Sequence, residues 1–151
     1  MSIVTEMPEE SIILKAKEIL SRRFLRPAPL SSMTDIADYF MMQLSEKEQE
    51  IFYVVFFDNR LCMIDYQEMF YGTLNQVVVH AREVVKRALH HNAASVILVH
   101  NHPSGTIEIS KEDRSLTITL KEALALVDIT VLDHIVICGT HAISFAEKGL
   151  I

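Results

Sequence analysis

The sequence predicts an α/β fold in which a mixed β-sheet is covered by helices. Two observations predict this class. Short, strongly apolar runs alternate along the chain with segments of helical periodicity, and polar turn residues separate the two kinds of segment. The chain has 151 residues, of which 50% are hydrophobic, and this is enough to bury one sizeable core. We therefore expect one compact domain.

A leading segment precedes the predicted domain. Residues 9–24 have the pattern of an amphipathic helix. Its apolar face comprises Ile12, Ala16, Ile19 and Leu20. Pro and Ser residues then interrupt helical structure, so we interpret residues 1–32 as an N-terminal helical arm and linker, and residues 33–151 as the domain. Because the apolar face needs burial, we expect the arm to contact the domain, a second copy of the chain or another protein.

The first expected elements of the domain are a helix and two strands. Ser32 resembles an N-terminal cap. Apolar residues then recur every four positions, at Ile36, Phe40 and Leu44, which predicts a helix. The run EIFYVVFFDNR is rich in β-branched and aromatic residues and ends in a turn, so it predicts a strand. The next run, LCMIDYQEMF, predicts the returning strand.

Strands and helices alternate through the rest of the chain. The apolar run 77–79 is predicted to be a strand, and AREVVKRALHHN after it a helix with one apolar face. Residues 94–100, ASVILVH, end at a Pro-Ser-Gly turn, which is typical of a strand buried on both faces. Ser110 begins a helix with an apolar stripe from Leu116 to Val127. ITVLDHIVIC and AISF predict the last two strands.

Composition argues against several classes of function. The net charge is −6, whereas nucleic-acid binding needs an excess of Lys and Arg on one face, so we do not expect direct nucleic-acid binding. No apolar run has the length of a membrane span and the N-terminus lacks the layout of a signal peptide, so we expect a cytoplasmic protein without membrane association. Cys62 and Cys138 lie in apolar surroundings and are predicted to be buried free thiols.

Two histidines stand where the predicted strand 94–100 ends. Side chains two residues apart on a strand point to the same face, with Cα atoms about 6.5 Å apart, so the imidazoles of His100 and His102 can converge on one ion. Pro103 cannot donate to a sheet ladder, so it ends the strand and leaves both rings at the rim of the sheet. Taken alone, such histidines are more often hydrogen-bonded than metal-bound.

Asp113 is the candidate for a third metal ligand because it falls in the first turn of the helix that begins at Ser110. The same spacing is also typical of a capping box. The two interpretations are compatible, since one carboxylate can face a metal while Ser110 holds the start of the helix. His134, inside an apolar strand, is expected to be a core histidine with a partner. Five histidines are not assigned to the metal: His80, His90, His91, His134 and His141.

These motifs together resemble a known family. The string HNHPSG, then Ser110 and Asp113, with LDHIVI downstream and REVVKRALHHNAASVILV upstream, is similar to the RadC family of JAMM (MPN-plus) metalloprotease-like domains. The resemblance covers residues 33–151 and implies a cytidine-deaminase-like JAMM/MPN architecture. The site residues that it implies are Glu50 and Ser110 for catalysis, and His100, His102 and Asp113 for the metal.

The resemblance also implies a chemistry. It predicts one Zn²⁺ per chain and a metallopeptidase or isopeptidase that acts on an unidentified polypeptide substrate. Glu50, directly before the run IFYVVFF, would be the general base, and Ser110 would donate a hydrogen bond to the oxyanion. From the residues alone, Glu68 and Glu83 are also candidates for the base, and Glu50 ends a polar run that would ordinarily be exposed.

Two other functions remain open at this point. One is a non-catalytic, zinc-stabilised module associated with DNA repair or replication proteins, which the association of the RadC name with repair suggests. The other is a zinc hydrolase acting on nucleic acid, which the acidic balance disfavours. The short leader is expected to leave no room for the helix-hairpin-helix region of longer RadC proteins. Ile109 replaces a Pro of many relatives, which should loosen the loop without removing a ligand.

Overall fold

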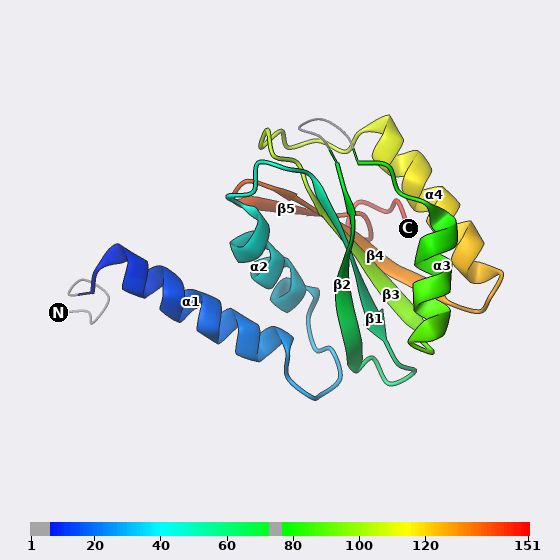
Figure 1. Ribbon diagram of the computed structural model, residues 1–151, viewed down its shortest axis with the longest axis horizontal. Helices are drawn as coiled ribbons and strands as arrows, with labels where there is room; N and C mark the ends of the chain where they lie inside the picture. Colours follow the sequence, from blue (N-terminus) through cyan, green and yellow to red (C-terminus); the bar gives the residue numbers. More distant parts are fainter. Residues whose placement is uncertain (1–6, 73–76) are drawn as a thin grey trace.

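The structure is a computed structural model that describes residues 7–72 and 77–151. Its centre is a five-stranded sheet with the strand order β2-β1-β3-β4-β5 (Figure 1). The strands are β1 (Ile51–Phe57), β2 (Met63–Tyr71), β3 (Ser95–Asn101), β4 (Thr130–Cys138) and β5 (His141–Ser144). The helices are α1 (Glu9–Phe24), α2 (Met33–Leu44), α3 (Ala81–His90) and α4 (Lys111–Ala125).

The sheet is mixed and is covered on both faces. β3 and β4 run parallel and are joined through α4, whereas β2 with β1, β1 with β3, and β4 with β5 are antiparallel. α2 packs on one face, and α3 and α4 pack on the other (Figure 1). The predicted α/β class, a mixed sheet covered by helices, is confirmed.

The central strands explain the continuous apolar runs of the sequence. Every residue of β1 and β3 is buried. Alternate side chains of β1 enter two different cores: Phe52, Val54 and Phe56 pack toward α3 and α4, and Tyr53, Val55 and Phe57 pack toward α2. Both faces of these strands are covered. Their sequences therefore do not alternate between apolar and polar residues, as those of a strand with one exposed face would.

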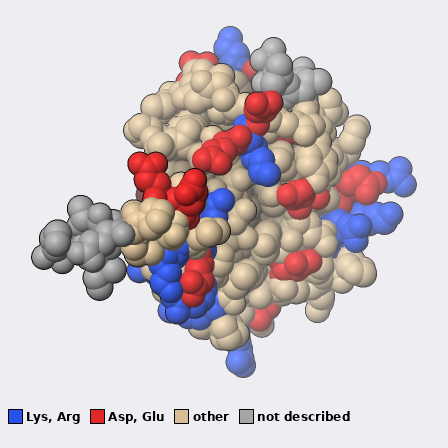
Figure 2. Space-filling view, turned by 60° about the vertical axis from the view of Figure 1, so that its left-hand side comes forward, with Lys and Arg blue, Asp and Glu red and all other residues tan. Residues whose placement is uncertain are grey.

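Helix α1 forms over the residues predicted for the arm. Its last residue, Phe24, is 7% exposed, and the ring stacks on Tyr39 with the ring centroids 4.2 Å apart. The N-terminal half of the helix extends away from the body (Figure 1), and Leu14 there is 68% exposed. On the face drawn in Figure 2, Lys and Arg side chains gather at the lower left and at the right edge, and acidic side chains are scattered over the face, including beside both groups. The four residues of the predicted apolar face are half-buried, whereas Leu14, outside that face, is exposed on a single chain.

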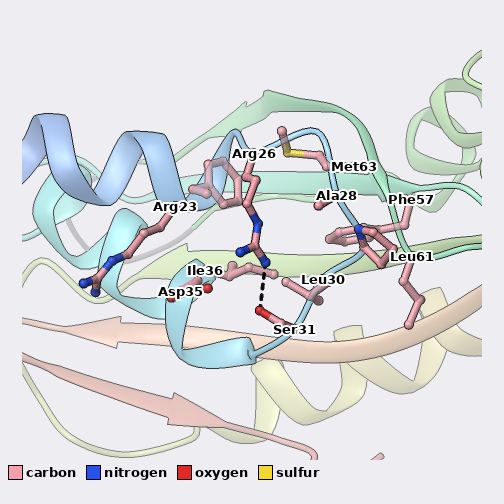
Figure 3. Close-up of a pocket in the computed structure, with 12 residues that line it drawn as sticks. Arg23, Arg26, Ala28, Leu30, Ser31, Asp35, Ile36, Phe57, Leu61 and Met63 are labelled. Carbon is pink, nitrogen blue, oxygen red and sulfur yellow. Dashed lines mark hydrogen bonds between the residues drawn. The ribbon is translucent and has the colours of Figure 1, made fainter.

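The linker between α1 and α2 is fastened to the turn that joins β1 and β2. The backbone N–H of Leu30 donates to the carbonyl of Leu61 at 2.8 Å. Arg26 reaches across to the hydroxyl of Ser31, to which it donates at 3.0 Å, whereas Arg23 points away from this bond (Figure 3). The cavity that these residues enclose is about 20 Å³, which is room for about one water molecule. These contacts therefore hold the linker against the domain.

Two local predictions differ from the structure. The strand predicted at 77–79 is wrong: these residues have no regular secondary structure, and instead Val77 and Val79 pack against the core under α3 and α4 while Val78 is exposed. Cys138 is a buried free thiol as predicted, but Cys62 is only half-buried because it lies at the end of the exposed turn between β1 and β2. Within the described residues, no helix combines the length and the apolar character needed to cross a membrane.

Candidate metal centre

His100 and His102 lie at the carboxyl end of β3. His100 pairs with Phe52 of β1 and its ring stacks on the Phe52 ring, so the imidazole is held on the face that α3 and α4 cover. The backbone N–H of His102 donates to Ile137 at 2.8 Å, which prolongs the ladder with β4 by one residue. Both rings therefore turn to the same side, and their Nε2 atoms are 3.2 Å apart.

The Pro-Ser-Gly turn carries the chain away from the sheet directly after His102. The N–H of Gly105 donates to the carbonyl of His102 at 2.9 Å, and Gly105 has φ +74°, a left-handed conformation that glycine adopts without strain. The turn ends the strand at His102 and leaves the ring of His102 beside that of His100.

Asp113 reaches the histidines from the first turn of α4. The predicted capping box is present: Ser110 Oγ accepts from the Asp113 N–H at 2.9 Å, and the Ser110 N–H donates to Asp113 Oδ2 at 3.2 Å. The same carboxylate faces both rings, with Oδ1 3.2 Å from His100 Nε2 and Oδ2 3.1 Å from His102 Nε2. Capping and the contact with the histidines thus occur together, which the sequence left as compatible interpretations.

Glu50 is buried, at 6% exposure, although it ends a polar run whose other members are exposed. Its Oε1 lies 3.7 Å from His100 Nε2. The backbone on either side of Glu50 is held by Asn101: the N–H of Ile51 donates to Asn101 Oδ1 at 2.8 Å, and Asn101 Nδ2 donates to the carbonyl of Gln49 at 3.1 Å. The residue between the two histidines therefore fixes the segment that carries Glu50.

The donor atoms have the spacing that a tetrahedral ion requires. Two ligand atoms about 2.0–2.1 Å from a tetrahedral zinc ion lie about 3.3 Å from each other. The contacts of Asp113 with His100 and His102, and the contact between the two rings, are 3.1–3.2 Å. One donor atom each from Glu50, His100, His102 and Asp113 lies within 4.8 Å of every other. Two imidazoles, one carboxylate and a second carboxylate slightly farther away fit a metal ion with an open position.

The electrostatics of the cluster favour a cation. The hydrogen bond to Asp113 raises the pKa of His102 to about 10. Burial alone would raise the pKa of Asp113, but the close approach of His100 and His102 to its carboxylate outweighs burial and holds that pKa well below its usual value. For Glu50, burial raises the pKa, against the opposing effect of His100 and His102. Two buried carboxylates therefore attract positive charge to the point where the ring nitrogens converge.

The other glutamates that the sequence offered as a base lie elsewhere. Glu68 of β2 accepts hydrogen bonds from Tyr53 and Tyr71, and these bonds lower its pKa. Glu83 is exposed on α3. Among the described residues, the cluster that could hold a metal includes neither of them, and of the seven histidines it includes only His100 and His102.

His134 and Thr117 lie behind the cluster, where His134 contacts His100 and Thr117 contacts His134, and the sequence did not reveal these contacts. His134 of β4 is fully buried, as expected for a core histidine with a partner. Its Nε2 lies 2.7 Å from His100 Nδ1, and its Nδ1 lies 2.6 Å from Thr117 Oγ1 of α4. Burial lowers the pKa of His134 well below its usual value. The motif LDHIVI contained the histidine, but nothing in it indicated the contact with His100.

The cluster lies in a cavity of about 630 Å³. The lining includes the apolar residues Val77, Val79 and Leu116. It also includes the exposed carboxylates of Glu108 and Glu112. Among the described residues that line the cavity, none is Lys or Arg. The volume is in the range of sites that hold small molecules or side chains.

Comparison with known proteins identifies the family. A sequence model described as the RadC-like JAB domain matches residues 30–150. The chain belongs to this RadC-like family. The resemblance inferred from the motifs is confirmed, and the sheet and helices described above fit the JAB/MPN architecture.

Curated relatives of this RadC-like chain carry the name UPF0758 protein. One from Coxiella burnetii is 46% identical over 143 residues, which is 91% of this chain and 64% of that protein. Another from Thiobacillus denitrificans is 49% identical over 140 residues, which is 93% of this chain and 62% of that protein. The chain therefore spans less than two thirds of these two relatives. A Vibrio cholerae UPF0758 protein is 45% identical over 141 residues, and the match covers 89% of its length.

Proposed function

We propose that this RadC-like domain is a zinc-dependent hydrolase that cleaves peptide or isopeptide bonds. The observation that carries the proposal is the arrangement of four donor groups in one cavity. His100, His102 and Asp113 approach one another to 3.1–3.2 Å, while Glu50 lies at 3.7 Å from the nearest ring nitrogen. Three close ligands with a fourth position left open are typical of catalytic rather than structural zinc sites.

Zinc is the metal that this donor set favours. Two imidazoles and one carboxylate match known catalytic zinc sites, and the described residues near the cluster include no group of thiolates that would close the site. When bound, such an ion lowers the pKa of water toward about 7 and polarises a carbonyl group. His100, His102 and Asp113 would hold the ion, in the proportion of one per chain.

Glu50 and Ser110 would supply the remaining groups that hydrolysis needs. Burial raises the pKa of Glu50, and a carboxylate with a raised pKa is a better proton acceptor at neutral pH. Glu50 would take a proton from water and return it to the leaving amine. The hydroxyl of Ser110 accepts from the Asp113 N–H, so its own proton remains available for the developing oxyanion.

The walls of the cavity favour a polypeptide over a nucleic acid. The lining includes the four acidic residues Glu50, Glu108, Glu112 and Asp113 and, among the residues described, no Lys or Arg. A polyanion bound here would face like charge without the basic side chains that neutralise phosphates. The apolar lining residues Val77, Val79 and Leu116 can contact an apolar side chain of a peptide.

The test begins with the wild-type chain purified without added metal. Elemental analysis should give about one zinc per chain. The zinc-loaded protein is then incubated with a peptide library, with branched peptides that contain a lysine isopeptide bond, and with single- and double-stranded DNA. Cleavage of a peptide or isopeptide bond is the expected result. If a chain fully loaded with zinc cleaves nothing, a non-catalytic zinc-stabilised module replaces the enzyme, and if it cleaves only DNA the nucleic-acid hydrolase does.

Asn101 gives a further prediction, because its amide holds the backbone on both sides of Glu50. Asn101→Ala should lower kcat/KM roughly tenfold, since a small displacement of a catalytic group is sufficient for such a loss. Zinc content should not change, because Asn101 contacts none of the three close donors. The unpaired backbone groups of Gln49 and Ile51 should also lower the free energy of unfolding by about 1–3 kcal/mol. Unchanged kcat/KM in a folded Asn101→Ala protein would contradict this role.

A further inference from the structure

We propose that Thr117 and His134 are positioning residues that fix the tautomer of His100, so that the Nε2 lone pair of His100 faces the metal. This inference rests on the zinc site of the proposed function. It concerns neither a ligand nor the base but a chain of hydrogen bonds behind them, which runs from α4 through β4 to β3.

The chain of contacts is continuous and buried. Thr117 Oγ1 donates to the carbonyl of Asp113 at 2.7 Å and lies 2.6 Å from His134 Nδ1. On the other side of the same ring, His134 Nε2 lies 2.7 Å from His100 Nδ1. The exposed fractions of Thr117, His134 and His100 are 2%, 0% and 1%, so water does not compete for these bonds.

The number of available protons determines which atom donates in each of these hydrogen bonds. A hydroxyl has one proton, and the 2.7 Å approach of Thr117 Oγ1 to the Asp113 carbonyl oxygen requires that proton between the two oxygens. Thr117 Oγ1 can then only accept from His134, which places a proton on His134 Nδ1. The ring is fully buried and its two nitrogens contact Thr117 and His100 rather than a carboxylate that would balance a charge, so this is its one proton. His134 Nε2 is left as an acceptor, and it must receive a proton from His100 Nδ1.

The consequence appears at the other nitrogen of His100. A neutral imidazole carries one N–H, so a proton on Nδ1 leaves Nε2 with its lone pair. Nε2 lies 3.2 Å from both Asp113 Oδ1 and His102 Nε2. Its lone pair therefore faces a carboxylate oxygen that also only accepts, and a metal ion between the two atoms satisfies both. If the chain ran in the opposite direction, the lone pair of Thr117 Oγ1 would face a carbonyl oxygen at 2.7 Å, and His100 would present an N–H to the metal.

A neutral histidine is suited to the position of His134 because its ring can donate one hydrogen bond, to Thr117, and accept another, from His100. Metal-bound histidines are commonly oriented by a carboxylate or a carbonyl, which accept only. Here the acceptor is an imidazole whose own proton must be placed first, and Thr117 places it. His134 adds no charge to the site. Asp133, the residue before His134 on β4, does not contact the ring nitrogens: its carboxylate accepts from Ser144 Oγ at 2.6 Å and from the Ala146 N–H at 3.0 Å.

The test compares two variants of Thr117 that differ in the hydroxyl. Thr117→Val removes the hydroxyl and keeps the shape, whereas Thr117→Ser keeps the hydroxyl. Zn²⁺ affinity is measured by competition with a chromophoric chelator. We expect Thr117→Val to weaken zinc binding about 10- to 100-fold, the effect of losing an outer-shell partner, and Thr117→Ser to remain within a few-fold of wild type. Thr119→Val, on the exposed side of the same helix, is the matched control and should bind zinc like wild type.

A second measurement reads the tautomers directly. Long-range ¹H–¹⁵N spectra of the wild-type chain should show His134 and His100 with the proton on Nδ1, and in Thr117→Val the His134 ring should lose this preference. Wild-type His134 protonated on Nε2, or equal zinc affinity of folded Thr117→Val and wild type, would overturn the inference. Neither readout needs cleavage, so an inactive but zinc-binding chain would refute the proposed enzyme and leave this inference standing. If the wild type binds no zinc, the inference falls with the site on which it rests.

Discussion

Replacing Glu50 with Gln is expected to lower hydrolysis at least about 100-fold while leaving zinc content unchanged, because a positioned general base typically contributes about 10²–10⁴-fold. Gln keeps the size of the side chain and its ability to hydrogen-bond, but it cannot take a proton from water. Glu50 lies 3.7 Å from His100 Nε2, beyond the 3.1–3.2 Å contacts among the three close donors, so the ion should remain. The measurement is kcat/KM on a cleaved peptide, with elemental analysis of the same sample.

The matched control is Glu48→Gln, which changes an exposed carboxylate two residues earlier in the same loop. It should hydrolyse the peptide at the wild-type rate and bind the same amount of zinc. Burial of Glu50 is the property that separates the two positions, since it raises the pKa of Glu50 and directs the carboxylate into the cavity. If Glu50→Gln cleaves as fast as wild type, Glu50 is not the base, and the proton must pass to another group of the cavity.

The parts of the site that the sequence could predict are those set by local geometry. The alternation of side chains on a strand places His100 and His102 on one side, and the capping box places Asp113 at the start of α4. Both depend on residues at most three apart. The fold class was predictable for the same reason. A strand that is covered on both faces needs apolar residues at successive positions, and this gives a continuous apolar run in the sequence.

Contacts between distant residues were not predictable in this way. His134 and Thr117 are 17 residues apart, and His134 and His100 are 34 apart; they meet because α4 returns the chain to β4 beside β3. The bond from Ile51 to Asn101 likewise joins residues 50 apart, and it holds the backbone next to Glu50, a buried residue that local polarity had suggested would be exposed. The strand predicted at 77–79 failed for a related reason: its apolar residues are used in packing under α3 and α4, and not in pairing with the sheet.

Loss of any one of the three close donors is expected to remove zinc from the site. His100→Ala and His102→Ala each delete a ring nitrogen, and Asp113→Asn replaces a carboxylate by a neutral amide, which is a poorer zinc ligand. Each change should weaken zinc binding at least about 100-fold. Losing a residue that only hydrogen-bonds a ligand costs about 10- to 100-fold, and losing a ligand itself should cost at least as much. Asp113→Asn is the most informative of the three, since its Oδ1 can still accept from the Ser110 N–H and α4 should keep its cap.

Zinc binding can be followed by its effect on unfolding, without any substrate. A ligand present at 100 times its Kd stabilises the folded state by about 2.7 kcal/mol, so the Tm of wild type should rise when zinc is added. The Tm of His100→Ala, His102→Ala and Asp113→Asn should not rise at the same zinc concentration. Glu112→Gln is the matched control, because Glu112 is an exposed carboxylate of the same helix turn and the same cavity; its Tm should rise as in wild type. An equal rise in Asp113→Asn would show that Asp113 is a helix cap alone, and the ion would then be bound without it.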